Sequence, residues 1–277
     1  MKKAIRIVGI IAVAALIIAA IAASMNNKPS NAEKVWDTAM TIGNPEAENY
    51  FVIYSDLVCP YCVAFENAIV EHEEDFQKYI EENDILFEVR LSDFLYEYGE
   101  SNPVHSLYSA LGSYCAKREG KFWDYYNLAI TSIWNDYFKS SGKAAFSKLS
   151  SVGKDYWINI GKKIGLGENF TSCVQNEETL DEIQANAAKT AKLINGMPYF
   201  KLNNYISSGF DLSWDYQYVL MYFQAGLESK NKEPTHNMNS LMSRDIKAKS
   251  AFRQILAAVG AEQCDKIYYH IAKLPRH

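Results

Sequence analysis

Residues 49–62, NYFVIYSDLVCPYC, join an apolar run directly to a pair of cysteines separated by two residues. The short, continuous apolar run over 49–56 is typical of a buried strand. Asp56 is expected to be a turn or helix-capping residue. Pro60 is favoured at the first position of a helix, so we expect a helix to begin there. Cys59 then lies at the helix start, where free N–H groups and the helix dipole stabilise a thiolate.

The cysteine pair, Cys59 and Cys62, allows three interpretations. A zinc site typically needs two close pairs of nitrogen or sulfur ligands, but the remaining three cysteines are isolated in the sequence. A structural disulfide across four residues would close a very small ring, which stabilises a fold little. A C-x-x-C pair beside a strand and a helix is a redox signal, so thiol–disulfide chemistry is favoured.

The order of the predicted elements indicates an α/β sheet interrupted by helices. The helix that begins at Pro60 is expected to continue through Ile80, because its apolar residues keep helical spacing. The pattern is then helical from 103 to about 191. Strand patterns lie on both sides of that helical block, and they cover 38–48, 49–56, 84–94 and 197–210.

Two distant segments resemble the DsbA-like branch of the thioredoxin superfamily. GNPEAENYFVIYSDLVCPYC resembles its opening, which often has Gly-Asn-Pro, a strand, Ser-Asp and Cys-Pro-x-Cys. NGMPYFKLNN resembles its second signature, a cis-proline ahead of a strand, and CAKREGKFWDYYNLAI resembles its helical insert. The resemblance covers roughly 38–228. It implies a thioredoxin-like α/β fold with a large all-helical insertion.

The resemblance also implies a thiol–disulfide oxidoreductase whose cofactor is its own redox-active disulfide, with no metal. Cys59 is then the exposed sulfur that forms a mixed disulfide with a substrate, and Cys62 is the leaving thiolate. Pro60 and Tyr61 complete the motif and contact the substrate.

Further roles follow from the same resemblance. Met197–Pro198 is expected to be a cis peptide bond that faces the cysteine pair, with Pro198 catalytic and Met197 in contact with the substrate. The backbone of Met197 could pair with an extended substrate segment. Cys115 and Cys173 are expected to form a structural disulfide across the helical block.

The N-terminus begins with three basic residues in MKKAIR, followed by an uninterrupted apolar run from Ile7 to Ala23. A helix of this length just spans a hydrocarbon core of about 30 Å, and the apolar core of a cleavable signal is usually shorter, roughly 7–15 residues. We therefore predict an uncleaved transmembrane anchor, although AIAAS could serve as a cleavage site. Basic residues before the run place the rest of the chain on the extracytoplasmic face, where disulfides persist.

The formal net charge of −5 gives no reason to expect nucleic acid as a partner. The apolar content of 48% indicates a folded body, whereas the C-terminal region is basic and includes a short amphipathic helix expected over 241–259. The predicted division begins with an anchor over 1–24 and a linker over 25–35. A first thioredoxin-like part over 36–92, a helical insertion over 93–190 and a second thioredoxin-like part over 191–228 follow. The chain ends with a basic extension over 229–277.

The hypothesis from the sequence is a membrane-anchored, extracytoplasmic oxidase that introduces disulfides into exported proteins with free cysteines. A quinone-linked membrane protein of the DsbB or vitamin K epoxide reductase type would re-oxidise it. Two alternatives stay open: a disulfide reductase or isomerase on the same fold, and a non-catalytic chaperone that binds copper or zinc.

Overall fold

The computed structural model describes residues 34–93, 104–141, 149, 152–194, 196–231 and 235–236. Within these segments no helix is long and apolar enough to cross a membrane. The predicted anchor over 1–24 and the amphipathic helix expected over 241–259 both lie outside them, as does Cys264.

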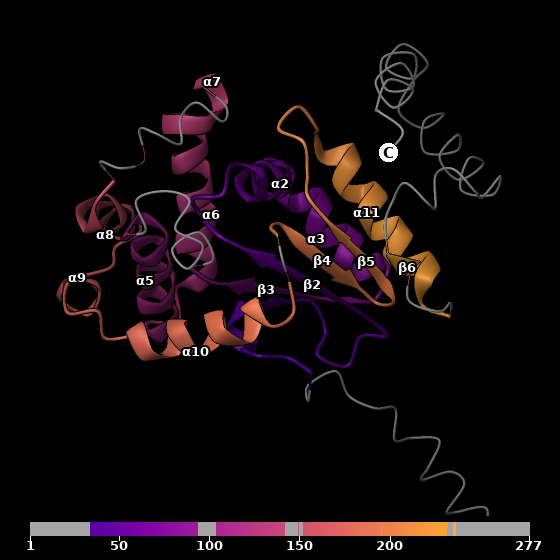
Figure 1. Ribbon diagram of the computed structural model, residues 1–277, viewed down its shortest axis with the longest axis horizontal. Helices are drawn as coiled ribbons and strands as arrows, with labels where there is room; N and C mark the ends of the chain where they lie inside the picture. The colour runs from indigo at the N-terminus through magenta and orange to yellow at the C-terminus, as the bar shows by residue number, and fades with distance from the viewer. Residues whose placement is uncertain are drawn as a thin grey trace, which may run out of the picture.

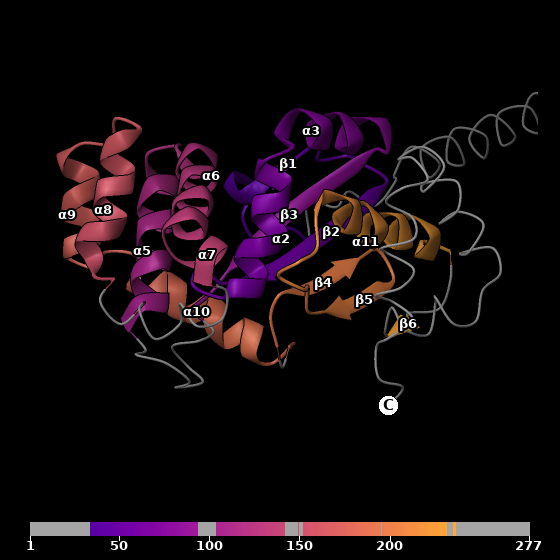
Figure 2. The same cartoon turned by 90° about the horizontal axis from the view of Figure 1, so that it is seen from above.

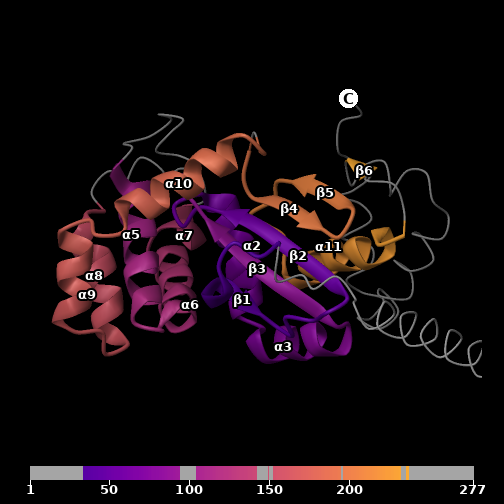
Figure 3. The same cartoon turned by 90° about the horizontal axis from the view of Figure 1, so that it is seen from below.

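The strands of the described segments form one mixed sheet in the order β1-β3-β2-β4-β5-β6; Figure 1 shows the sheet from its side, and Figure 3 labels all six strands. Parallel pairing joins β2 to β3, while β4 is antiparallel to both β2 and β5. The edges are the two-residue strands β1 and β6. The bounds are β1 Thr41–Ile42, β2 Asn49–Ser55, β3 Ile85–Leu91, β4 Tyr199–Leu202, β5 Tyr205–Ser208 and β6 Thr235–His236.

Three helices cover one face of the sheet, as Figures 1 and 3 show from two directions: α2 (Pro60–Val70), α3 (Glu73–Glu82) and α11 (Tyr216–Ser229). The others form a helical block beside the sheet, on the left in Figure 2. This block consists of α5 Val104–Arg118, α6 Phe122–Ile133, a π-helical turn Trp134–Phe138, α7 Lys139–Ser141, α8 Lys154–Lys163, α9 Glu168–Gln175 and α10 Leu180–Ala191. The predicted α/β sheet interrupted by a helical block is therefore confirmed.

The continuous helix expected from Pro60 through Ile80 is wrong. The backbone of His72 is non-helical, with φ −127° and ψ 36°, so α2 ends at Val70 and α3 begins at Glu73. The His72 ring stacks on Tyr216 of α11, with ring centroids 4.6 Å apart. The break lets α3 take its own direction over the sheet, and helical spacing alone did not reveal it.

Two shorter differences concern the edges of the sheet. The segment 38–48, predicted as a strand and turn, contains a 3₁₀ turn at Thr38–Met40 and only the two-residue strand β1. Strand β6 lies within the basic extension, where no strand was predicted. Both strands are too short to leave a periodic pattern in the sequence.

Helix α2 is buried on nearly all sides, because it packs between α6 of the helical block and α11. Phe65 lies at the centre of this packing, with its ring centroid 4.8 Å from that of Phe200 and 5.3 Å from that of Phe210. Aromatic pairs at such distances add to the free energy gained from burial. Helix α2, which begins at the cysteine pair, therefore packs against the helical block on one side and against α11 and the sheet on the other.

The opposite face of the sheet carries a buried ion pair, in which Arg90 lies 2.7 Å from Glu88. The backbone N–H of Trp36 donates to Glu88 at 2.7 Å, and the Trp36 ring lies 4.1 Å from the Arg90 guanidinium carbon. Asp37 also pairs with Lys117 of α5 at 2.7 Å. The beginning of the described chain thus joins the sheet to the helical block.

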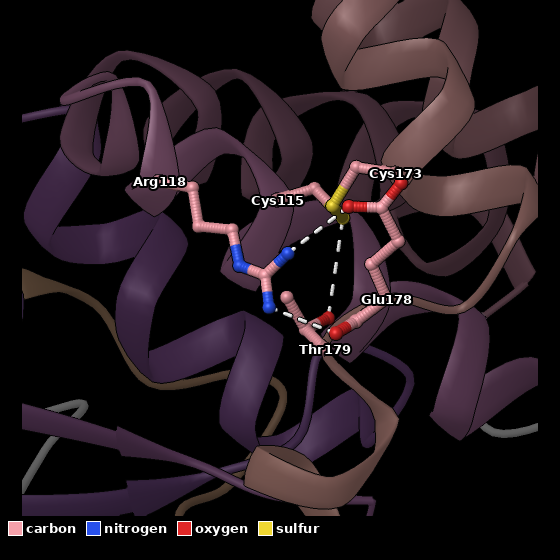
Figure 4. The surroundings of a disulfide bond; sticks show 5 residues. All are labelled: Cys115, Arg118, Cys173, Glu178 and Thr179. Carbon is pink, nitrogen blue, oxygen red and sulfur yellow. Dashed lines mark hydrogen bonds and ion pairs between the residues drawn. A yellow bond between two sulfur atoms is a disulfide. The ribbon is translucent and has the colours of Figure 1, made fainter.

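Within the helical block, Cys115 of α5 and Cys173 of α9 form a disulfide (Figure 4). Arg118, one turn beyond Cys115, donates to the backbone carbonyl of Glu178 at 2.8 Å and also pairs with its carboxylate. The Thr179 hydroxyl lies 3.9 Å from the Cys115 sulfur. The bridge implied by the family resemblance is present, and it ties the start of the block to the segment that leads into α10.

Candidate active site

The cysteine pair lies where β2 meets α2, at the carboxyl end of a central strand. Cys59 is the N-cap residue of α2, and Pro60 occupies its first turn. The Cys59 carbonyl accepts the N–H of Val63 at 3.0 Å. The predicted turn from strand into helix is therefore confirmed, and it places the Cys59 sulfur at the positive end of the helix dipole.

The two thiols have different environments. Cys59, which we expected to be exposed, is buried with 5% of its surface accessible, and Cys62, one helical turn further in, is fully buried. Burial raises the pKa of the Cys62 thiol well above its ordinary value, and interactions with Cys59 and Glu66 raise it further. Cys62 is consequently an internal thiol that holds its proton, and Cys59 is the sulfur nearer to the surface. Tyr61 between them is half-buried.

The segment from the second part of the sheet reaches the same place. The Met197–Pro198 peptide bond is cis, as the family resemblance implied. The Cys59 thiol donates to the backbone carbonyl of Met197, with sulfur and oxygen 3.9 Å apart. Pro198 is buried, and its carbonyl accepts the N–H of Gly209 at 2.8 Å. Residues far apart in the sequence thus meet at the Cys59 sulfur.

Asp56 stabilises the turn that precedes the pair. One carboxylate oxygen accepts the N–H of Val58 at 3.0 Å, and the other accepts the hydroxyl of Ser106 from α5. The backbone carbonyl of Asp56 accepts the N–H of Cys59 at 3.0 Å. The role as a turn residue is confirmed, and the contact with Ser106 adds a link from the helical block to the active-site turn.

One titratable group beside the cysteine pair was not anticipated from the sequence, namely Glu66. It lies in α2, four residues after Cys62, and is only 3% exposed. Burial raises the pKa of its carboxyl to about 8, with a smaller upward contribution from Asp56. The available signal was an acidic residue next to Phe65 within an apolar helix, which is unusual because charged side chains are seldom fully buried.

No three His, Cys, Asp or Glu side chains within the described segments are grouped so that they could hold a metal ion. The site consists of two thiols, a helix N-terminus and a cis-proline loop on a mixed sheet with flanking helices. This combination defines the class of thioredoxin-fold proteins with a dithiol centre.

A comparison with family models agrees with this class. The family described as thioredoxin matches residues 36–212, and the chain belongs to this family. The resemblance inferred from the two motifs is thereby confirmed, and thiol–disulfide oxidoreductase activity is supported at the level of the family.

The chain is similar to several solved structures. A thioredoxin-like oxidoreductase from Silicibacter pomeroyi DSS-3 is 19% identical, with 69% of this chain and 94% of that chain covered and a TM-score of 0.47. For alpha-DsbA1 from Wolbachia pipientis the identity is 16%, the coverage 69% of this chain and 92% of that chain, and the TM-score 0.46. For reduced DsbA from Mycobacterium tuberculosis the identity is 14%, the coverage 79% of this chain and 96% of that chain, and the TM-score 0.47. No curated protein sequence matches the chain.

Proposed function

We propose that this protein is an extracytoplasmic disulfide oxidase, which transfers the Cys59–Cys62 disulfide to exported proteins with free cysteines. The observation that carries the proposal is the asymmetry of the pair at the start of α2. Cys59 is the N-cap residue beside the Met197 carbonyl, whereas Cys62 is fully buried. In this proposal Cys59 reacts with the substrate, and Cys62 reacts only with Cys59.

The reaction begins with the oxidised pair. A substrate thiolate attacks the sulfur of Cys59, the bond between Cys59 and Cys62 breaks, and its electron pair remains on the sulfur of Cys62. A second substrate thiolate then attacks the substrate sulfur of the mixed disulfide and releases Cys59 as a thiolate. The substrate leaves with a new disulfide. The protein has been reduced by two electrons, and its cysteine pair is now two thiols.

The loop at Met197 supports the binding step. Its backbone can pair with an extended substrate segment as an added strand, while Pro198 offers no N–H that would compete for the neighbouring groups. Because the Met197 carbonyl lies 3.9 Å from the Cys59 sulfur, a segment bound there would bring its cysteine to Cys59. Pro60 and Tyr61 would line the same approach.

The direction of transfer is tested by the reduction potential of the pair in the full-length protein, measured in glutathione buffers. An oxidase should have a potential well above that of thioredoxin, about −270 mV, and nearer to that of DsbA, about −120 mV. A value near −270 mV would favour the reductase or isomerase alternative. A variant with serine at both Cys59 and Cys62 provides the baseline, since it retains the Cys115–Cys173 bridge.

Two further assays distinguish the remaining alternatives. Stoichiometric copper or zinc in the purified protein, lost in the double serine variant, would favour a metal chaperone. Re-oxidation needs a disulfide donor, for which we propose a quinone-linked membrane protein of the DsbB or vitamin K epoxide reductase type. Membranes that contain such a protein should re-oxidise the reduced chain only while quinone is present.

A further inference from the structure

Asp56 is a fully buried acid in the turn that leads to Cys59, and its carboxylate joins two parts of the molecule. One oxygen accepts the backbone N–H of Val58, and the other accepts the hydroxyl of Ser106 from the first turn of α5. Ser106 is also buried, with 1% of its surface exposed. A buried carboxylate is costly unless hydrogen bonds satisfy it, so the Ser106 hydroxyl helps to hold Asp56 in this position.

The backbone of Asp56 contacts both active-site cysteines. Its carbonyl accepts the N–H of Cys59 at 3.0 Å. Burial raises the pKa of the Cys62 thiol most, but a hydrogen bond with the Asp56 backbone acts in the opposite direction and lowers it. A hydrogen bond favours a thiolate when the sulfur accepts it, so the donor is the Asp56 N–H. The position of one residue therefore affects the environment of both sulfurs.

The helix that carries Ser106 is fixed to its surroundings on two sides. The hydroxyl of Tyr114 in α5 donates to the backbone carbonyl of Leu91, the last residue of β3, at 3.2 Å. The next residue, Cys115, joins α5 to α9 through its disulfide. Ser106 therefore reaches Asp56 from a helix that is bonded both to the sheet and to the rest of the helical block.

The contact with Asp56 distinguishes Ser106 from the other buried serines of α5. Ser109 donates to the Ser106 carbonyl at 2.7 Å, and Ser113 donates to the Ser109 carbonyl at 3.2 Å. Each is at most 1% exposed, as Ser106 is. Those two hydroxyls are satisfied within their own helix, whereas the hydroxyl of Ser106 is satisfied by the active-site turn. The helix thus offers a matched set of buried serines with different partners.

We propose that Ser106 is a positioning residue for the redox pair, which holds Asp56 so that its backbone N–H stabilises the Cys62 sulfur as it leaves. The inference rests on the proposed thiol–disulfide exchange. When a thiolate attacks the Cys59 sulfur, the bond to Cys62 breaks and the electron pair remains on the Cys62 sulfur, which later takes a proton from water. A hydrogen bond to a charged sulfur is stronger than one to a neutral sulfur, so it lowers the barrier to this step.

The proposal predicts a change in rate without a matching change in equilibrium. Because the pKa of Cys62 is raised well above its ordinary value, its thiol holds a proton in the reduced protein at neutral pH. The Cys62 thiolate therefore forms mainly during exchange, and a weaker hydrogen bond to it affects the barrier more than either end state. Loss of the Ser106 hydroxyl should slow attack on the disulfide and leave the reduction potential nearly unchanged.

The test is the rate of reduction of the oxidised full-length protein by dithiothreitol at pH 7, with the reagent in excess. Ser106→Ala should lower the second-order rate constant by about 10-fold, which is near the lower end of what a hydrogen bond to a charged group contributes. The equilibrium constant of the pair with glutathione, measured on the same samples, should change by less than about twofold. A large change in that constant with an unchanged rate would overturn the proposal.

Two further variants separate positioning from packing. Ser113→Ala removes a buried hydroxyl of the same size from the same helix, so it should react at the wild-type rate. Ser106→Thr keeps the hydroxyl and should recover most of the rate that Ser106→Ala loses. If Ser106→Thr reacts as slowly as Ser106→Ala, or Ser113→Ala is equally slow, the loss comes from packing and the proposal is wrong. Circular dichroism checks that each variant is folded.

The outcomes for Ser106 and for the proposed function are distinguishable. If the wild type exchanges disulfides with thiols while Ser106→Ala reacts at the wild-type rate, the positioning role is refuted and the proposed function stands. A wild type that exchanges no disulfide with thiols would overturn both. A slow Ser106→Ala beside a normal Ser113→Ala, with the reduction potential retained, would establish that the helical block controls how fast the pair reacts.

Discussion

At the scale of single residues, the two cysteines differ in what each can do. Cys59 lies at the helix start, next to the Met197 carbonyl, and Cys62 lies fully buried behind it. In the proposed function, the position of each sulfur decides its role: Cys59 is the sulfur that is attacked, and Cys62 is the thiol that resolves the mixed disulfide.

Replacement of the two cysteines one at a time should reveal this division. Cys59→Ser should abolish disulfide transfer to a reduced peptide, because the remaining thiol is shielded from the solvent. Cys62→Ser should instead accumulate a mixed disulfide through Cys59 when it is treated with an oxidised peptide, since no internal thiol remains to resolve it. Mass spectrometry without reductant measures both outcomes. Equal adduct formation by the two variants would contradict the assignment.

A second prediction at this scale concerns stability and pH. Glu66 has a folded pKa of about 8 against an ordinary value of 4.5, so the folded protein binds this proton more tightly than the unfolded chain. Its contribution to stability is fully present below pH 4.5 and is lost as the pH rises through 8. At about 1.36 kcal/mol per tenfold change in proton affinity, the loss amounts to a few kcal/mol.

Glu66→Gln should lack this loss, so its free energy of unfolding should rise relative to that of the wild type between pH 5 and 9. Urea unfolding at fixed pH values measures the difference. Parallel curves for the two proteins across this range would show that Glu66 keeps an ordinary pKa in the folded state. Glu71→Gln, which removes an exposed carboxylate directly after the same helix, serves as the control for the change in charge.

The sequence predicts a residue of the site only where that residue belongs to a recognisable motif or to the start of a predicted helix. Cys59, Cys62 and Pro198 lie in short patterns, and the resemblance placed them together although the chain folds a helical block between them. Glu66 has no such pattern. Its burial depends on α6 covering α2, a contact between separate parts of the chain that helical periodicity does not encode.

At the scale of elements, close packing of α11 against the sheet fixes the second half of the fold. Gly226 of α11 lies so near the strands that an added Cβ would be 2.6 Å from Leu202 and 2.8 Å from Phe51. The helix and the two strands therefore approach one another at a position where only hydrogen fits.

Gly226→Ala should destabilise the protein by about 1–3 kcal/mol, because overpacking exceeds the gain of up to about 1 kcal/mol in helix propensity. Thermal and urea unfolding measure the change. Gly153→Ala is the matched control, since an added Cβ there meets no atom within 4 Å. A Gly226→Ala protein as stable as the wild type would indicate that α11 can shift away from β4 and β2.

The elements themselves were largely predictable from hydrophobic patterns, but their ends were not. The run from Pro60 to Ile80 keeps helical spacing across His72, so its break is visible only in three dimensions, where His72 meets Tyr216. The two edge strands of the sheet, at Thr41–Ile42 and Thr235–His236, are likewise products of pairing with a neighbour and not of their own sequence.

At the scale of the whole molecule, the helical block carries its own covalent constraint. Cys115 and Cys173 are 58 residues apart in the sequence, and their bridge closes most of the block into one loop. Without a bridge that closes a loop of this length, the unfolded chain has more conformational freedom. In the chain-entropy model, the loss of the bridge should therefore lower the free energy of unfolding by about 4 kcal/mol.

Serine at both Cys115 and Cys173 should therefore lower the free energy of unfolding by up to that amount. The measurement is best made with serine also at Cys59 and Cys62, so that added reductant acts on no other pair in the described part of the chain. Reductant should lower the stability of the parent with the bridge and leave the variant without it unchanged. Peptide mapping without reductant should show the two fragments linked, and a bond from Cys264 to either one would refute the pairing.

The short edges of the sheet bear on how such a protein can work among unfolded chains. β1 and β6 each offer only two residues to a passing strand, and long exposed edges are what promote sheet-to-sheet aggregation. A catalyst that repeatedly meets extended, half-folded polypeptides would otherwise become a template for their assembly. In the proposed function the substrate backbone pairs with the loop at Met197, and the two-residue edge strands offer it little other backbone to join.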